Sequence, residues 1–201
     1  PLVWGNAETH FAYVFNLCSG QSRRTGSKLY VVILEPDANN GSADRKNMNV
    51  LDSFAGAGGF SMGFSMLPQY RVVGGIEMDK WAAETFALNH PEATTLVGPI
   101  QSFSDKKLKA SFTERPDIIL GGPPCQGFSI ANRNAGDAKD PRNSLFKEFV
   151  RLGRVFEPEI MIMENVPNLV KARTHDGELV IDIIERELRA LGYHVRHTIL
   201  H

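Results

Sequence analysis

A cysteine in a turn of glycines and prolines is the first group in this sequence that could do chemistry. Cys125 lies in the stretch GGPPCQGFS, residues 121–129, directly after an apolar run. The two prolines before it fix the backbone angle φ and stiffen the approach to the sulfur. A turn is a poor place for a cysteine that only fills core space. The position therefore favours a nucleophile, which would act as a thiolate. Cys18 has no such context and is predicted to be structural or incidental.

A second candidate is a carboxylate that ends an apolar run. Glu164 lies near the end of EIMIMENV, residues 159–166. Burying a charge is costly unless the charge is paired or used, and burial can raise the pKa of a carboxyl until it is protonated near neutral pH. The alternative is an ordinary strand-end residue exposed to water. The presence of Cys125 on the neighbouring predicted strand favours the functional interpretation.

A glycine-rich stretch and a later acid form a third candidate. The stretch DSFAGAGGFSMGF covers residues 52–64, and its glycines would let the backbone approach a ligand at a helix N-terminus. Glu77 ends the next predicted strand roughly 20 residues further on, where an acid can accept hydrogen bonds from ribose hydroxyls. Either feature alone is explained by a tight turn or a solvated carboxylate. Together they predict a ligand that carries a nucleoside.

Strands that alternate with helices must position these groups. Strands are expected over residues 49–54, 71–79, 93–97, 116–122, 159–166 and 193–200, and helices over residues 58–67, 80–90, 143–156 and 176–192. Such alternation predicts an α/β fold with a doubly wound, mostly parallel sheet. Ligands bind at the carboxyl ends of the strands in sheets of this kind, so the candidate groups should meet at one edge.

The N-terminal segment, the net charge and the cysteine count give less information about function than the motifs do. Residues 1–48 are predicted to be an N-terminal extension with a β-hairpin, in which YVFNL pairs with LYVVILE, followed by a linker; residues 49–201 form the cofactor-binding and catalytic domain. The 201 residues carry a net charge of −1 and two cysteines, too few for a disulfide framework or a cysteine-built zinc site. We therefore expect no metal, no membrane partner and a reduced, cytoplasmic setting.

Three motifs in order give the chain a resemblance to a known family. DSFAGAGGFSMGF, GGPPCQGFS and ENV, on alternating strands and helices, resemble the cytosine-C5 DNA methyltransferases from about Asn49 to the C-terminus. The resemblance implies a Rossmann-like fold, S-adenosylmethionine as methyl donor, and double-stranded DNA as partner, with the target cytosine flipped out of the duplex. It also implies a bacterial, nucleoid-associated protein of a restriction-modification system.

The resemblance assigns roles to individual residues. Cys125 would add to C6 of the cytosine, Glu164 would bond to or protonate N3, and Asn165 would orient the loop that carries Cys125. Met78 stands where the family often has a tryptophan, and Pro99 stands where it usually has an aspartate. The cofactor-binding residues implied are Phe54, Ala55, Gly56, Gly58, Gly59, Glu77, Met78, Ile100, Pro123 and Leu145. The DNA-contacting residues implied are Gln126, Ser129, Arg133 and Arg142; for the two arginines, a solvated charged loop is the alternative.

The C-terminal stretch VRHTILH leaves several alternatives open. The family continues with a motif rich in glutamine and arginine and with a target-recognition region, which this sequence does not contain. The chain is then the catalytic portion of a longer methyltransferase, one subunit of a split enzyme, an RNA cytosine methyltransferase, or a non-catalytic module that binds the cofactor or a partner. We expect a sheet that is incomplete at the C-terminus, and an isolated chain that binds the cofactor weakly and methylates poorly.

Overall fold

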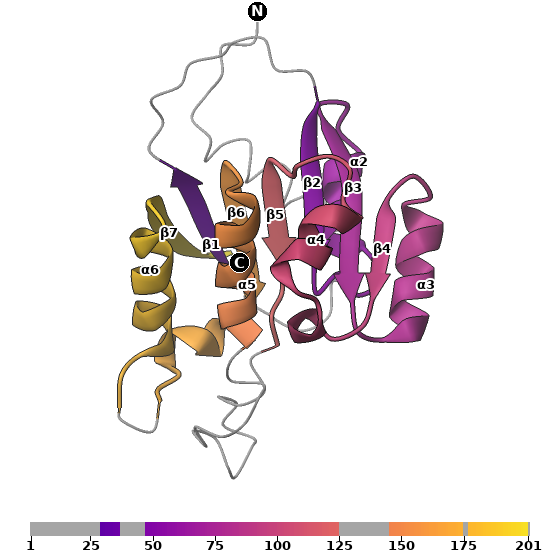
Figure 1. The fold of residues 1–201 in the computed structure, drawn as a ribbon. Helices are drawn as coiled ribbons and strands as arrows, with labels where there is room; N and C mark the ends of the chain where they lie inside the picture. The colour runs from indigo at the N-terminus through magenta and orange to yellow at the C-terminus, as the bar shows by residue number, and fades with distance from the viewer. Residues whose placement is uncertain (1–28, 37–46, 125–144, 175–176, 201) are drawn as a thin grey trace, which may run out of the picture.

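The chain folds into one twisted sheet with helices on both faces (Figure 1). The computed structural model describes residues 29–36, 47–124, 145–174 and 177–200. The strands are β1 (Leu29–Pro36), β2 (Met48–Ser53), β3 (Tyr70–Glu77), β4 (Thr94–Val97), β5 (Ile118–Gly121), β6 (Ile160–Asn165) and β7 (Tyr193–Leu200). The helices are α2 (Gly59–Ser65), α3 (Lys80–Asn89), α4 (Asp105–Ser111), α5 (Leu145–Phe156) and α6 (Val180–Ala190), with short 3-10 helices η1 (Ile100–Ser102) and η4 (Pro167–Lys171).

The sheet has seven strands in the order β4-β3-β2-β5-β6-β1-β7. The pairs β4–β3, β3–β2, β2–β5 and β5–β6 are all parallel. The strand order reverses its direction of growth between β2 and β5, which is the switch point where ligands bind in doubly wound sheets. The predicted mostly parallel, doubly wound α/β sheet is confirmed.

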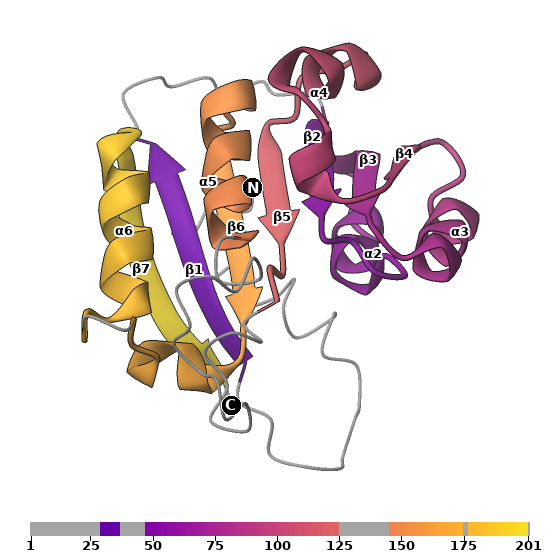
Figure 2. The ribbon, with the colours of Figure 1, turned by 60° about the horizontal axis from the view of Figure 1, so that its bottom comes forward.

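Strand β1 comes from the N-terminal extension and lies inside the sheet. It runs antiparallel to β6 on one side, with Val32 opposite Met163, and antiparallel to β7 on the other, with Val32 opposite His197. Figure 2 shows β1 between these two strands. The run LYVVILE is therefore a strand, but its described partners are β6 and β7. Residues 13–17, its expected hairpin partner, lie outside the described residues, so the hairpin and the division at residue 48 remain predictions.

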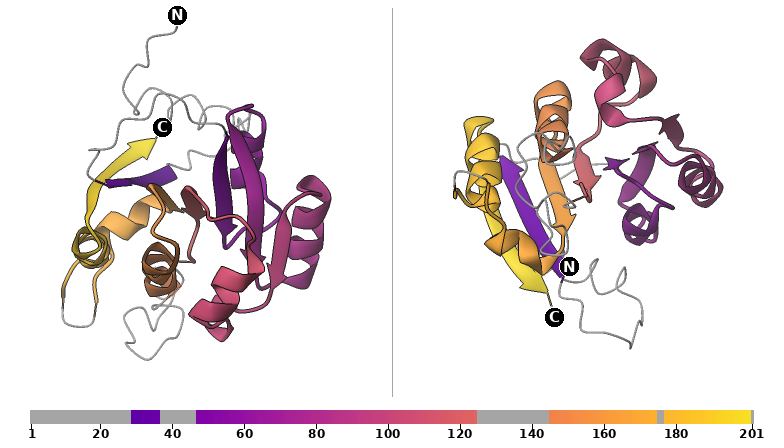
Figure 3. Two further views of the ribbon diagram at one scale, coloured as in Figure 1. Left: turned by 45° about the horizontal axis from the view of Figure 1, so that its top comes forward. Right: turned by 90° about the horizontal axis from the view of Figure 1, so that it is seen from below.

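The two faces of the sheet bury separate apolar layers. Helices α4, α5 and α6 cover one face, and α2 and α3 cover the other at the β4 end (Figure 3). Because successive strand residues point to opposite faces, Ile119 joins the layer under α5 while Ile118 and Leu120 join the layer under α2 and α3. Strand β5 is therefore buried on both faces, and a continuous apolar run is typical of such a central strand.

Helix α4 is the main described element that the sequence pattern did not predict. Its sequence, DKKLKAS, buries only Leu108. Its start is set by Ser104, whose hydroxyl accepts a hydrogen bond from the backbone N–H of Lys107 at 3.2 Å. A single buried residue in a short polar run gives no measurable helical period, so this helix had no pattern to reveal it.

Candidate active site

The ends of four parallel strands bring the predicted groups to one edge of the sheet. Ser53 at the end of β2 pairs with Ile76 of β3 and with Gly121 of β5, and Gly121 pairs with Met163 of β6. The right-hand view of Figure 3 looks onto this edge from below. The glycine-rich loop, Glu77, the turn that leads to Cys125, and Glu164 thus share one edge, as the strand pattern predicted.

The loop after β2 is held in an unusual backbone conformation. Phe54 has φ 59°, a left-handed value that is uncommon for a residue with a side chain, and Gly56 and Gly58 have φ 54° and 84°. The loop is fixed because Ala55 N–H donates to the carbonyl of Ile76 (3.1 Å) and Gly58 N–H to that of Ala55 (2.8 Å). A strained backbone that neighbouring contacts hold in place is typical of ligand-binding loops.

Glu77 connects this loop to β3 and retains capacity for a ligand. Its Oε2 accepts a hydrogen bond from the backbone N–H of Gly56, and its Oε1 accepts one from the backbone N–H of Asp79, both at 2.7 Å. An ionised carboxylate has about four acceptor positions. The positions that remain suit a pair of ribose hydroxyls. Asp79 caps α3 by accepting a hydrogen bond from the backbone N–H of Ala82 at 2.8 Å.

Exposed apolar side chains lie next to Glu77. Met78 is 67% exposed and Val97 is 52% exposed, and Val97 pairs with Glu77 in the sheet register. Pro99 follows Val97 after one intervening residue, Gly98, and precedes η1. Large exposed apolar groups beside a carboxylate with remaining acceptor positions match a ligand with an apolar ring and a polyol. The side chains around this loop therefore fit the adenosine part of S-adenosylmethionine.

A buried polar cluster, formed by Asp52, Ser61 and His90, lies beneath the glycine-rich loop. Ser61 N–H donates to Asp52 Oδ2 (3.2 Å), and the Ser61 hydroxyl donates to Gly58 O (3.2 Å) and lies 3.1 Å from His90 Nε2. Burial raises the pKa of Asp52 to about 7 and lowers the pKa of His90 from its usual value. A side chain at Gly58 would meet the His90 ring at 2.8 Å, so His90 also requires glycine there.

The turn after β5 is tied to β6 by an amide side chain. Asn165 Nδ2 donates to the carbonyl of Pro123 (3.0 Å), and its Oδ1 accepts from the backbone N–H of Val166 (2.8 Å). Asn165 is 6% exposed, and its bond to Pro123 is shielded from water. Gly121 has no room for a side chain, because a Cβ would lie 2.5 Å from the Ser53 hydroxyl. The path of the chain up to Pro124 is therefore set by packing and by Asn165.

Glu164 lies against this turn. A Cβ on Gly122 would be 3.1 Å from Glu164 Oε2, so the glycine allows the carboxyl to approach the turn closely. Burial raises the pKa of Glu164 above its ordinary value. A carboxyl with a raised pKa can hold a proton and donate a hydrogen bond to a basic ring nitrogen. The structure thus places a candidate proton donor next to the segment that leads to Cys125.

Some of the predicted site residues lie at the carboxyl edge of the sheet or beside it, and others lie outside the described residues. Ile100 is buried, and Leu145 is partly buried against the same apolar layer. Lying outside the described residues are Cys125, Gln126, Ser129, Arg133 and Arg142, whose roles remain predictions. Sequence reasoning gave no role to Asp52, Ser61, His90 or Arg151. Only Asp52 had a signal in the sequence: it follows the apolar residues Val50 and Leu51, which points to a buried carboxyl.

The described residues show neither a metal centre nor a membrane-spanning helix. Among them, no three His, Cys, Asp or Glu side chains gather closely enough to hold a metal ion. No described helix has the length and apolar character needed to cross a bilayer.

The doubly wound sheet and the groups at its carboxyl edge define an α/β protein of the Rossmann-like methyltransferase class. Within that class, the chain belongs to the C-5 cytosine-specific DNA methylase family, whose family model matches residues 48–201. The resemblance inferred from the three sequence motifs is thereby confirmed.

Individual relatives support the same assignment. The chain is 43% identical over 153 residues to the type II methyltransferase M.DdeI of Desulfomicrobium norvegicum, covering 76% of this chain and 36% of that protein. It is 36% identical over 156 residues to the type II methyltransferase M1.HphI of Haemophilus parahaemolyticus, covering 77% and 41%. A crystal structure of a prophage-encoded E. coli DNA modification methyltransferase superposes with TM-score 0.55 at 28% identity, covering 72% and 37%. The chain thus spans well under half the length of these relatives.

Proposed function

We propose that this chain carries the catalytic centre of a DNA (cytosine-5-)-methyltransferase that uses S-adenosylmethionine. The observation that carries the proposal is the bond from Asn165 to the carbonyl of Pro123, next to Glu164. It fixes the approach to Cys125 beside a candidate proton donor, at the same edge as the loop bonded to Glu77. Membership of the methylase family supports the reaction.

The proposed nucleophile is Cys125. C5 of cytosine is too weak a nucleophile to accept a methyl group directly. Addition of the Cys125 thiolate to C6 would give the ring enamine character and activate C5, which is covalent catalysis. After C5 is methylated, loss of the C5 proton and elimination of the sulfur would restore the aromatic ring and free the cysteine.

Glu164 would act on the other side of the ring. Negative charge builds up on the ring as sulfur adds, and a protonated Glu164 would donate to N3 and stabilise that charge. Its raised pKa favours the protonated form needed for this role. Asn165 would act as a positioning residue, since it contacts the loop backbone through Pro123.

The cofactor would supply an electrophilic methyl group on a sulfonium. Glu77 would hold its ribose hydroxyls, and Met78 and Val97 would pack against its adenine. The remaining predicted contacts lie along the same edge or on α5: Phe54, Ala55, Gly56, Gly58, Gly59, Ile100, Pro123 and Leu145.

Double-stranded DNA is the proposed substrate, with the target cytosine flipped into the site. Gln126, Ser129, Arg133 and Arg142 would face the DNA, and target recognition would come from further sequence or from a complementary subunit. The bacterial type II relatives support a role in a restriction-modification system and a location in the bacterial cytoplasm.

Nucleoside analysis tests the proposal and separates its alternatives. The full polypeptide, with any partner subunit, is incubated with S-adenosylmethionine and with mixed-sequence DNA or RNA, and the digested nucleosides are analysed by mass spectrometry. We expect 5-methyl-deoxycytidine, and its loss in Cys125→Ser. Methylated cytidine from RNA alone would favour an RNA methyltransferase. Cofactor binding without methylation of either polymer would favour the non-catalytic module.

A further inference from the structure

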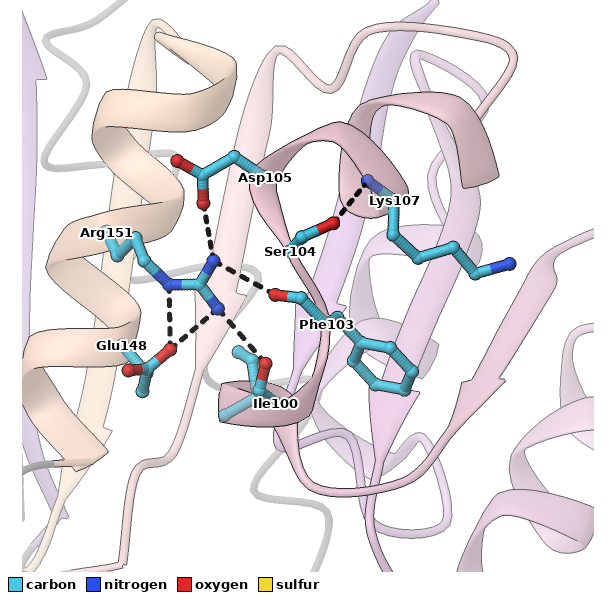
Figure 4. A network of polar contacts seen from close by, with 7 residues as sticks. All are labelled: Ile100, Phe103, Ser104, Asp105, Lys107, Glu148 and Arg151. Carbon is cyan, nitrogen blue, oxygen red and sulfur yellow. Dashed lines mark hydrogen bonds and ion pairs between the residues drawn. The ribbon is translucent and has the colours of Figure 1, made fainter.

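Arg151 on α5 binds four groups that belong to two separate parts of the chain (Figure 4). Within its own helix, Nε donates to Glu148 Oε2 at 2.8 Å. Across the fold, Nη1 donates to Asp105 Oδ1 at 2.6 Å and to the carbonyl of Phe103 at 3.2 Å, and Nη2 donates to the carbonyl of Ile100 at 3.0 Å. These partners are 46 to 51 residues away in sequence.

A guanidinium is needed for this set of contacts. Its planar fork presents five N–H donors at fixed angles, so it can serve two carbonyl oxygens and two carboxylates at once. A lysine ammonium could keep one ion pair but could not hold both carbonyls in the same positions. Arg151 therefore does more than form surface ion pairs: it also fixes the backbone of residues 100–103.

The clamped segment adjoins the proposed adenine site. Strand β4 ends at Val97 opposite Glu77, and Gly98 N–H donates to the carbonyl of Glu77 at 2.8 Å. The ring of Phe103 lies over Gly98, where an added Cβ would meet it at 3.1 Å. The path from Glu77 to Ile100 is thus short and packed, and a shift at Ile100 would move Val97 and Gly98.

The other half of the clamp belongs to α5. This helix begins at Leu145, a residue implied to contact the cofactor, and Leu145 packs against the apolar layer that contains Ile100. Arg151 lies in the same helix and holds the Ile100 segment against it. The two walls that carry Ile100 and Leu145 are therefore joined by one side chain.

We propose that Arg151 is a positioning residue for cofactor binding: it sets the spacing between the Ile100 segment and α5, and so the shape of the adenine end of the site. The inference rests on the proposed function, in that this edge is taken to bind S-adenosylmethionine. Arg151 itself contacts none of the reacting atoms in this account.

Calorimetric titration of the full polypeptide, with any partner subunit, with S-adenosylhomocysteine tests the inference. The variants are Arg151→Lys, Arg151→Gln and, as a matched control on the same helix, exposed Arg154→Gln. Each is titrated well below its own thermal unfolding transition, so that affinity is measured on folded protein. We expect both Arg151 variants to bind S-adenosylhomocysteine at least about tenfold more weakly, because charge-assisted hydrogen bonds are lost. The control should bind it as tightly as the unsubstituted protein does.

The outcomes separate the inference from the proposed function. If Arg151 only stabilised the fold, its variants would melt earlier but keep their affinity, and that result would overturn the inference alone. Equal weakening in Arg154→Gln would also overturn it, because the effect would not be specific to the clamp. Arg151→Lys is the milder change and keeps the test informative if Arg151→Gln does not fold. No binding of S-adenosylhomocysteine by the unsubstituted full polypeptide would instead count against the proposed cofactor.

Discussion

The Asn165 amide donates a hydrogen bond to the carbonyl of Pro123 across two neighbouring strands, at 3.0 Å and shielded from water. This bond joins the end of β6 to the turn that leaves β5. The same asparagine accepts a bond from Val166 N–H, so its amide is fixed from both sides. One buried side chain thus holds the approach to Cys125 next to Glu164.

Replacing Asn165 should weaken the fold and the reaction together. In Asn165→Ala, the Pro123 carbonyl loses its donor in a buried site, which should cost about 1–3 kcal/mol of unfolding free energy in urea titrations. Methyl transfer should fall in kcat more than in KM for S-adenosylmethionine, because the contacts of Glu77 are untouched. Asn49→Ala is the control, since Asn49 Nδ2 makes an exposed bond to the carbonyl of Arg115 at 3.2 Å. Equal losses in the two variants would contradict the assigned role.

Glu77→Gln should reduce cofactor affinity. Glu77 accepts from two backbone N–H groups, one on each oxygen. The glutamine amide offers only one oxygen, so its NH₂ group would face the backbone N–H of either Gly56 or Asp79, and that hydrogen bond would be lost. We expect S-adenosylhomocysteine to bind roughly tenfold or more weakly in calorimetric titrations. Glu84→Gln, which removes only an exposed pairing with Lys80, should bind normally; a wild-type affinity in Glu77→Gln would refute the ribose assignment.

Asp52 should make stability depend on pH. Burial raises its pKa from 3.8 to about 7, so between these values the folded protein holds a proton that the unfolded chain has lost. The raised pKa of Asp52 therefore adds to the unfolding free energy at low pH, and this stabilisation is lost as pH rises through about 7. Asp52→Asn cannot titrate, so its unfolding free energy relative to wild type should rise with pH, by at most about 1.4 kcal/mol per pH unit.

Urea unfolding from about pH 5 to about pH 8 measures this difference. His90, whose lowered pKa acts in the opposite sense by costing stability at acid pH, is present in both proteins and largely cancels. The control is Asp182→Asn, because Asp182 is exposed on α6. A pH-independent difference between Asp52→Asn and wild type would show that Asp52 titrates normally.

Strand β1 should be required for the sheet. Val32 lies between Met163 and His197 in an interior strand, where proline removes a ladder hydrogen bond. We expect Val32→Pro to lose roughly 2 kcal/mol or more of unfolding free energy relative to Val32→Ala, which keeps the backbone N–H. Indistinguishable unfolding curves for the two variants would mean that β1 does not pair as described.

Local pattern was enough to predict most of the sheet edge. Glu77 and Glu164 each end an apolar run, and parallel strands place their carboxyl ends together, so the meeting of these groups followed from the sequence. The place of β1 between β6 and β7 did not follow, because a strand run does not state which distant strands it will join. Arg151 and His90 were missed for a related reason: their partners lie about 30 to 50 residues away and arise only from packing.

The central claim is that Cys125 attacks cytosine, and covalent trapping tests it most directly. The full polypeptide, with any partner subunit, is mixed with S-adenosylmethionine and duplex DNA in which every cytosine is 5-fluorocytosine, so that knowledge of the target site is unnecessary. Fluorine cannot leave C5 as a proton does, so the sulfur cannot be eliminated and the adduct should persist on a denaturing gel. We predict an adduct that maps to Cys125, survives Cys18→Ser and is absent in Cys125→Ser. An adduct that persists in Cys125→Ser would contradict the account.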